Sequence, residues 1–274
     1  ELSYIAKKIE KTGIDGIEIG FACPMGEGQD IIAGDPERVY AYTCEVVKAV
    51  HVPVSVKLSA AVGNLSAVVE AAGKAGASGI SGIDTLRCIL KIDIESGKPD
   101  LPTYGGYSGA PIRPIGLATI ASIAQCTDLP VIGMGGIENY ENLIEYIMAG
   151  ASAGGIGTAI LLHGYDVVTQ TIQHLETWMQ AHGIKSIEEI RGRALPELYS
   201  FEEIKRDMKQ VKLIKEQNGA SCTKCRKCID CCLHNAISSP EDPEAPIQIH
   251  ESLCDGCGLC VSVCPERKLI LCRL

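Results

Sequence analysis

Two runs of closely spaced cysteines constrain this chain more than any other feature. Nine of its 14 cysteines fall between residues 222 and 264, in two dense groups. Each group contains the spacing C-x2-C-x2-C-x3-C, at residues 222–232 and at residues 254–264. This spacing is typical of ferredoxins with two [4Fe–4S] clusters, in which the fourth cysteine of each run binds the other cluster. The last quarter of the chain is therefore predicted to carry electrons one at a time.

The crossed ligation assigns each cysteine to one cluster. The ligands of the first cluster are predicted to be Cys222, Cys225, Cys228 and Cys264. The ligands of the second cluster are predicted to be Cys254, Cys257, Cys260 and Cys232. Cys231 is left without a ligand role. Zinc is the alternative, but the ligands of a tetrahedral zinc site usually come as two separated pairs, rather than as three closely spaced residues followed by a fourth.

The composition describes a globular chain with material for one large domain and one small domain. Hydrophobic residues make up 46% of the 274 residues, yet no stretch approaches 18 uninterrupted apolar residues, so no membrane is expected as a partner. The first residues form an amphipathic helical pattern without a signal-peptide layout, and we expect a cytoplasmic protein. The net charge of -9 and the aromatic content of 4% make nucleic acid an unexpected partner.

Residues 13–165 alternate short apolar runs with helical patterns. The predicted strands are residues 16–20, 53–57, 79–83, 130–134 and 154–157. The predicted helices between them are residues 35–50, 65–75, 114–125 and 139–149. This alternation indicates an α/β fold with a parallel sheet. No G-x-G-x-x-G follows the first strand, which favours a (β/α)8 TIM barrel over a doubly wound sheet.

Helical patterns follow the last predicted strand. They comprise residues 166–182, a capped turn at 186–189 and a charged stretch at 201–217. The dipeptide Asn218-Gly219 marks a turn, after which the composition shifts to cysteine. We therefore place the barrel portion at residues 1–217 and a ferredoxin-like α+β domain at residues 218–274.

Three short motifs, together with the cysteine runs, carry a family resemblance. They are Phe21-Ala-Cys-Pro24, Thr103-Tyr-Gly-Gly-Tyr-Ser-Gly-Ala-Pro-Ile-Arg-Pro114 and Gly133-Met-Gly-Gly136. Over essentially its whole length the chain resembles the dihydropyrimidine dehydrogenases, in particular the bacterial NAD-dependent type whose FMN subunit carries a C-terminal two-cluster domain. The barrel is also similar to dihydroorotate dehydrogenase. The resemblance implies an FMN- and iron–sulfur-dependent oxidoreductase that acts on a carbon–carbon bond of a pyrimidine-like ring.

The resemblance also implies an FMN site. Gly135 and Gly136 match its phosphate-binding glycines, which lie between a strand and a helix N-terminus that favours an anion. The other cofactor residues that it implies are Gly157 and Thr158 at the phosphate, Gly109 in the loop over the flavin, and Lys57 at the flavin ring. Taken without the resemblance, the glycines read as tight turns and the lysine as a residue of the barrel rim.

Cys23 matches the cysteine that acts as the general acid in the family, although a single cysteine is also compatible with an inert, buried side chain. The substrate residues implied are Asp84 and Thr85, where the family has Asn-Thr. Gly20 stands where the family has a substrate-binding asparagine. Because an aspartate only accepts hydrogen bonds where an asparagine also donates them, these departures leave open a ring other than uracil or thymine.

Five predicted strands do not close an eight-stranded barrel. The resemblance places further strands upstream, so we expect either a longer protein or a partner that supplies them. The chain has no dinucleotide fingerprint, and NAD(P) and FAD are expected only on a partner flavoprotein subunit. The resemblance also implies an oligomer. Two alternatives remain: a ferredoxin-like electron carrier on a degenerate barrel, and a related FMN enzyme with a different unsaturated substrate.

Overall fold

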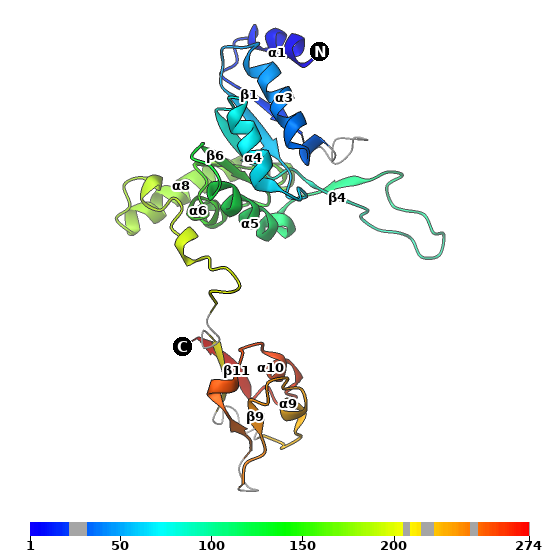
Figure 1. The fold of residues 1–274 in the computed structure, drawn as a ribbon, viewed down its shortest axis with the longest axis vertical. Helices are drawn as coiled ribbons and strands as arrows, with labels where there is room; N and C mark the ends of the chain where they lie inside the picture. Colours follow the sequence, from blue (N-terminus) through cyan, green and yellow to red (C-terminus); the bar gives the residue numbers. More distant parts are fainter. Residues whose placement is uncertain (22–31, 205–208, 215–221, 242–245, 274) are drawn as a thin grey trace. The chain divides into compact units, whose positions relative to one another are not determined.

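The computed structural model describes residues 1–21, 32–204, 209–214, 222–241 and 246–273 (Figure 1). The chain divides into two compact units, residues 1–198 and residues 199–274. Within the described residues, no helix is both long enough and apolar enough to cross a membrane.

A parallel sheet organises the first unit. Its strands, in their order across the sheet, are β1 (Ile17–Gly20), β2 (Val54–Leu58), β3 (Gly79–Gly82), β6 (Val131–Met134) and β7 (Ala153–Gly155). This order follows the chain without the reversal that marks a doubly wound sheet. The predicted α/β fold of the TIM-barrel type is confirmed, and each predicted strand is present to within two residues.

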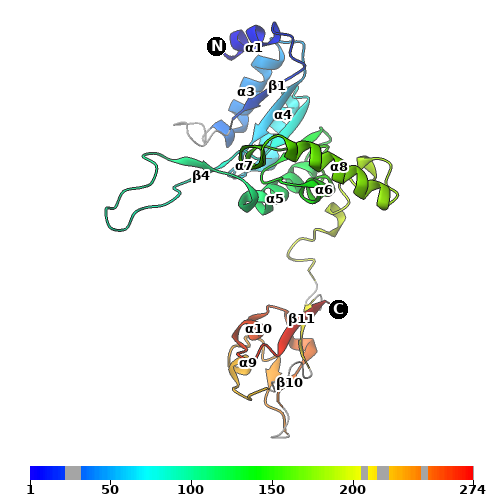
Figure 2. The same cartoon turned by 180° about the vertical axis from the view of Figure 1, so that it is seen from behind.

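Helices cover one face of this sheet, as the views of α3, α4 and α5 in Figures 1 and 2 show. The helices of the unit are α1 (Leu2–Glu10), α3 (Pro36–Val47), α4 (Leu65–Lys74), α5 (Arg113–Ala124), α6 (Tyr140–Met148), α7 (Thr158–His163) and α8 (Asp166–Ala181). Strand β2 shows why the two faces differ. Val54, Val56 and Leu58 are buried on the helix side, whereas Ser55 and Lys57 are half-buried on the other.

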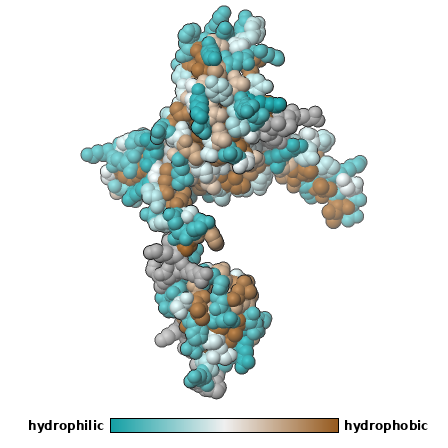
Figure 3. Space-filling view, in the orientation of Figure 1, coloured by the Kyte–Doolittle hydropathy of each residue, from teal (hydrophilic) through white to brown (hydrophobic). Residues whose placement is uncertain are grey.

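An antiparallel hairpin that was not predicted interrupts the βα pattern. Strands β4 (Leu86–Cys88) and β5 (Gly105–Tyr107) pair at its base, and residues 89–104 form an arm that extends away from the sheet (Figures 1 and 2). Apolar side chains are exposed along the arm (Figure 3), and Ile94 is 90% exposed. The arm leads back to the sheet through the 3-10 helix η1 (Ala110–Ile112).

The connection between the units differs from the expectation. The capped turn is confirmed, because η2 (Ile187–Glu189) begins with a capping box between Ser186 and Glu189, and η3 (Leu195–Glu197) follows. The charged helix predicted at residues 201–217 is wrong. Strand β8 (Lys209–Leu213) lies there and pairs with β11 (Leu269–Arg273), so the second unit begins well before residue 218.

The second unit consists of two similar halves, related by a shift of 32 residues. In the first half, α9 (Lys227–Asp230) precedes β9 (Ile237–Ser238), and in the second half α10 (Leu259–Val263) precedes β11. Strand β10 (Gln248–Ile249), followed by η5 (Glu251–Leu253), pairs with β9 as β8 pairs with β11. Left-handed backbone recurs at the shifted positions: φ is 55° and 67° at Lys224 and Gly256, and 63° and 78° at Arg226 and Gly258.

Candidate functional site

Lys57 lies at the carboxyl end of β2, between neighbouring strands. Its register partners are Gly20 on β1 and Ser81 on β3. Active sites of TIM barrels form at this end of the strands. The lysine side chain points away from the helix-covered face and is 24% exposed. A cation therefore stands where the strands of the sheet end.

Asp84 holds this lysine. Its Oδ2 atom lies 3.6 Å from the Nζ of Lys57, and the Asp84 side chain is 16% exposed. Its Oδ1 atom accepts a 2.7 Å hydrogen bond from the backbone N–H of Thr85. Both carboxylate oxygens thus have partners within the chain, which gives Asp84 a positioning role that sequence comparison did not suggest. The substrate roles of Asp84 and Thr85 stay predictions.

Three of the glycines predicted to bind cofactor, together with Thr158, pack closely. A Cβ atom at Gly136, whose φ is +76°, would lie 2.6 Å from the carbonyl oxygen of Gly109. A Cβ atom at Gly109, whose φ is +83°, would in turn lie 3.4 Å from the Cγ2 of Thr158, whose hydroxyl donates a 2.9 Å hydrogen bond to Ser108. Gly135, with a φ of +117°, lies next to Gly136. The loops after β5, β6 and β7 therefore converge at residues that the sequence singled out.

Backbone N–H groups without an acceptor among the described residues lie where these loops meet. In the described part of the chain, the N–H groups of Gly135, Gly136 and Gly157 donate to no residue. Helix α6 begins only at Tyr140, and its first turn is capped by the side chain of Asn139. The donors left for an anion are thus the glycine amides rather than the first turn of that helix. Successive backbone N–H groups in a turn can form an anion-binding concavity, and donors of this kind fit the phosphate of FMN.

Two residues that the sequence reading missed support the glycine loop. Tyr146 of α6 is fully buried, and its hydroxyl donates to the carbonyl oxygens of Gly135 at 2.7 Å and Met134 at 3.2 Å. Burial raises the pKa of Tyr146, so that the hydroxyl stays protonated and donates. Arg113 donates to the carbonyl of Gly136 at 3.5 Å. Tyr146 could have been found from the sequence, because it is a tyrosine within the apolar pattern of a predicted helix.

The predicted general acid, Cys23, lies outside the described residues, and its role stays a prediction. Gly20 is described, and among the described residues a Cβ atom there would meet no heavy atom within 4 Å. Gly20 is the register partner of Lys57, and its match to the family's substrate-binding asparagine stays a prediction.

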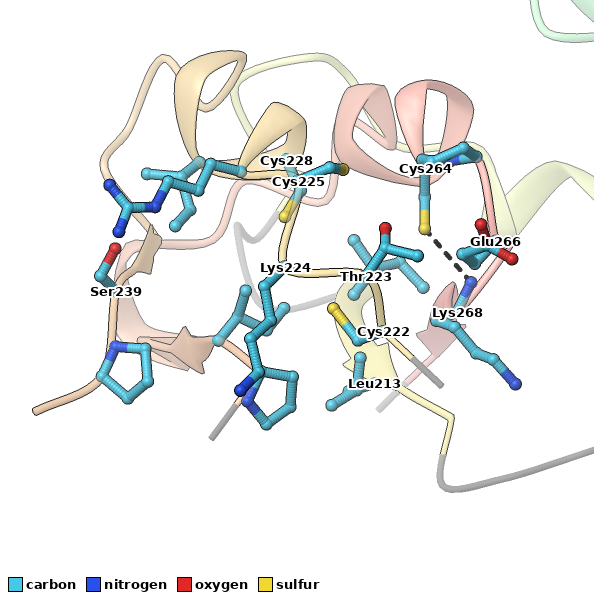
Figure 4. Close-up of a pocket in the computed structure, with 17 residues that line it drawn as sticks. Leu213, Cys222, Thr223, Lys224, Cys225, Cys228, Ser239, Cys264, Glu266 and Lys268 are labelled. Atoms are coloured by element: carbon cyan, nitrogen blue, oxygen red, sulfur yellow. Dashed lines mark hydrogen bonds between the residues drawn. The ribbon is translucent and has the colours of Figure 1, made fainter. Parts of the chain in front are cut away.

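The eight cysteines predicted as cluster ligands divide between two cavities of the second unit. The first cavity, of about 100 Å³, contains Cys222, Cys225, Cys228 and Cys264 in its lining (Figure 4). The second cavity, of about 20 Å³, contains Cys232, Cys254, Cys257 and Cys260, together with Cys231. Each cavity thus combines three cysteines of one run with the fourth of the other run, which is the crossed arrangement of a two-cluster ferredoxin.

Backbone hydrogen bonds distinguish Cys232 from Cys231. The N–H of Lys268 donates to the Sγ of Cys264 at 3.3 Å (Figure 4), and the N–H of Ala236 donates to the Sγ of Cys232 at 3.2 Å. These two bonds are equivalent in the two halves. The thiol of Cys231 instead donates to the carbonyl of Cys228 at 3.5 Å. This equivalence supports Cys232 as the fourth ligand.

The thiols crowd one another. Burial and the neighbouring Cys222, Cys225 and Cys264 raise the pKa of Cys228. Burial and nearby cysteines raise the pKa of Cys260 to about 11. Bound iron would relieve this crowding, because a coordinating thiol is deprotonated by the metal. No three His, Cys, Asp or Glu side chains in the described ranges are arranged to hold a single metal ion.

Comparison with known proteins also separates the chain into a barrel portion and an iron–sulfur portion. The family model described as dihydroorotate dehydrogenase matches residues 1–179, and the one described as 4Fe-4S dicluster domain matches residues 221–268. The curated catalytic subunit of dihydroorotate dehydrogenase B (NAD(+)) from Pyrococcus furiosus is 37% identical over 196 residues, covering 71% of this chain. The same subunits from Thermococcus kodakarensis and Streptococcus pneumoniae (strain R6) are each 38% identical, covering 71% and 70% of this chain. This chain spans 65%, 65% and 62% of the lengths of these three relatives.

A solved structure shows the same fold. It is the crystal structure of DHODH from Eimeria tenella in complex with ferulenol, with a TM-score of 0.60 and a sequence identity of 18%. The match covers 70% of this chain and 57% of that chain.

Proposed function

Because this chain belongs to the dihydroorotate dehydrogenase family, we propose that it is an FMN- and iron–sulfur-dependent oxidoreductase acting on a CH–CH bond of a pyrimidine-like ring. The observation that carries the proposal is the division of eight motif cysteines between two cavities, in a chain whose barrel unit presents free glycine amides beside Lys57. Such a chain combines sites for a flavin and for one-electron carriers. The further assignment, to the dihydropyrimidine dehydrogenase type, rests on the resemblance in the motifs.

The described residues fit FMN by the chemistry of their donors. The amides of Gly135, Gly136 and Gly157 would hold its phosphate, and Gly109 would lie against the ring. Lys57, fixed by Asp84, would place a positive charge at the flavin ring. FMN, when bound, supplies hydride chemistry. The chain itself would supply the proton, for which Cys23 is the proposed donor.

The two clusters would carry electrons between this flavin and a partner. The proposed ligand sets are the four cysteines of each cavity. We place NAD(P) and FAD on a separate flavoprotein subunit, as the resemblance in the motifs implies. The names of the relatives support this arrangement, since they describe a catalytic subunit of an NAD(+)-dependent enzyme.

A substrate other than uracil or thymine is the second candidate. Two observations favour it: the space that the described residues leave around Gly20, and the engagement of the Asp84 carboxylate by Lys57 and the backbone N–H of Thr85. The ring would then be held by groups other than those of the dihydropyrimidine dehydrogenases. A dihydroorotate-like acid is a candidate, because the relatives at 37% and 38% identity are catalytic subunits of dihydroorotate dehydrogenase B.

Anaerobic purification tests the proposal. We expect FMN to be released by acid, with roughly eight irons and eight sulfides per chain, as two cubanes require. The bound flavin is then titrated separately with dihydrouracil, dihydrothymine and dihydroorotate, and bleaching by one of them identifies the substrate class. Eight irons without flavin would contradict the enzyme and leave an electron carrier. Flavin that none of these compounds bleaches would contradict the pyrimidine-like substrate.

A further inference from the structure

The 32-residue repeat of the second unit allows the surroundings of its two cavities to be compared position by position. Residues 222–228 and 264–268 supply the cysteines of the first cavity, and residues 254–260 and 232–236 supply those of the second. The first pair of segments contains five cations, which are Lys224, Arg226, Lys227, Arg267 and Lys268. The residues at the equivalent positions are Gly256, Gly258, Leu259, Asn235 and Ala236. The two halves thus share a backbone and differ in charge.

Carboxylates are equal in number in the two pairs of segments. Those of the first cavity contain one, Glu266. Those of the second also contain one, Asp255, whose Oδ2 lies 2.8 Å from the Nε2 of His234. Within these segments, the positive charge is therefore concentrated in the first pair.

Three of the cations occupy left-handed backbone, including Arg267 with a φ of 48°, and its equivalent, Asn235, has a φ of 53°. Lys224 and Arg226 have φ values of 55° and 63°, whereas the equivalent residues are the glycines expected in left-handed backbone. Backbone of this kind persists only where the surrounding structure enforces it. The side chains, rather than the backbone conformation, therefore distinguish these two positions.

These cations lie where a redox partner would approach. Lys224, Arg226 and Lys227 are exposed, and so is Cys225 between them. A cluster bound by Cys225 would therefore lie beside exposed cations, of which Lys224 is labelled with the cavity cysteines in Figure 4. Complementary charge accelerates encounter between proteins and matters most in small, transient redox interfaces.

We propose that the exposed segment Lys224–Lys227 is the docking surface for an acidic electron-transfer protein, which exchanges electrons with the cluster held by Cys222, Cys225, Cys228 and Cys264. The proposal rests on the cluster ligation proposed above and adds which cluster meets the partner and what charge that partner carries. One electron moves per encounter, from the reduced cluster to the oxidised partner or in the reverse direction.

The repeat provides a variant that should fold. The triple variant Lys224→Gly, Arg226→Gly and Lys227→Leu gives the first half the residues of the second half and removes left-handed non-glycine backbone. A matched control, Lys7→Gln, Lys8→Gln and Lys11→Gln, removes three exposed cations from the other unit. Both variants change the net charge equally, so they separate a local surface from overall charge.

The measurement is the stopped-flow rate at which the dithionite-reduced full chain reduces oxidised flavodoxin, an acidic probe, at low and high ionic strength. Basic cytochrome c serves as the opposite probe. We expect the triple variant to reduce flavodoxin about tenfold more slowly at low ionic strength and to lose most of the salt dependence. The rate with cytochrome c is not expected to fall. The control variant is expected to behave as the wild type.

Iron, sulfide and the electron paramagnetic resonance signal of the reduced clusters are measured first. A chain without clusters would overturn the proposed function and this proposal together. Loaded clusters with an unchanged flavodoxin rate in the triple variant, or with an equal loss in the control variant, would overturn this proposal alone. Inhibition by inorganic phosphate beyond that by chloride at equal ionic strength would also overturn it, because the cations would then hold a small anion.

Discussion

Lys57 is the residue whose charge the proposed flavin site needs most. It faces away from the helix-covered side of the sheet, and Asp84 holds its side chain. A hydrogen bond that involves a charged group contributes about 1.5–3 kcal/mol. We therefore expect Lys57→Met to weaken FMN binding by at least about tenfold. Flavin fluorescence during titration of the apoprotein measures the Kd.

Lys74→Met is the matched control for this prediction. Lys74 also pairs with a carboxylate, but its side chain is 66% exposed on α4. The control is expected to bind FMN as the wild type does. Equal affinities in Lys57→Met and the wild type would contradict the proposed contact between lysine and flavin.

Tyr146 predicts a dependence of stability on alkaline pH. Its pKa is raised by burial in the folded protein, whereas a tyrosine in the unfolded chain ionises at about pH 10. Above about pH 10 this tyrosine loses its proton in the unfolded state but keeps it in the folded state, which favours unfolding. It therefore leaves the free energy of unfolding unaffected below about pH 10 and lowers it as the pH rises further. We expect Tyr146→Phe to be less stable at neutral pH by about 1–3 kcal/mol, because two carbonyls lose their donor. It should lose less stability than the wild type above about pH 10.

Denaturant unfolding at about pH 8 and at about pH 10.5 measures both effects. The control is Tyr165→Phe, because Tyr165 is 83% exposed. Its alkaline loss should equal that of the wild type. A Tyr146→Phe variant with the full alkaline loss would show that the buried hydroxyl does not cause it.

At the scale of elements, local sequence patterns predicted the sheet well. Five strands and the four helices between them were found because each carries its own period of apolar residues, as β2 does. Strand β8 was missed because only Val211 and Leu213 are apolar in it and because its partner, β11, lies more than 50 residues away. The positioning roles of Tyr146 and Asp84 were missed for the same reason, since both depend on contacts between distant segments.

Strand β8 lies close to Gly256, and this approach can be tested by substituting Gly256 and a matched glycine, Gly97. Gly256 and Gly97 both have a φ of +67°. A Cβ atom at Gly256 would lie 2.5 Å from the carbonyl oxygen of Lys209, whereas one at Gly97 would meet none of the described residues within 4 Å. Gly97→Ala should cost about 1–2 kcal/mol, the left-handed strain alone. Gly256→Ala should cost more and should also lower cluster retention, measured by visible absorbance. Equal losses of stability in the two variants would mean that the backbone of β8 moves away from the added Cβ atom without a free-energy cost.

The crossed cysteine pattern gives a prediction about the two halves of the second unit. Cys264 belongs to the second run but lines the first cavity. Cys264→Ser should therefore disturb the cluster of Cys222, Cys225 and Cys228, and lower the iron content from about eight to about four per chain. Cys231→Ser is the control, because its thiol bonds a backbone carbonyl, and its iron content should be unchanged. Loss of iron in the control would show that Cys231 is a ligand.

At the scale of the whole molecule, the two units differ in what stabilises them. The main core of the first unit contains more than twenty buried hydrophobic residues, whereas that of the second contains Val211, Ile237, Cys260 and Leu269. For a unit of 76 residues, so small a core among the described residues gives little stability, and a metal or another cross-link would add to it. The iron–sulfur clusters would provide that stabilisation. The first unit has a larger core of its own and contains none of the eight motif cysteines.

Removing the clusters should therefore unfold one unit and leave the other folded. Trp178, the sole tryptophan of the sequence, lies on α8 in the first unit, where it stacks on His182 with ring centroids 4.4 Å apart. We expect a chelator with a mild oxidant to make residues 199–274 sensitive to protease while the fluorescence of Trp178 stays unchanged. Because the tryptophan reports on the first unit alone, a simultaneous change in its emission would show that the two units unfold together and that the small core does not set the stability of the second.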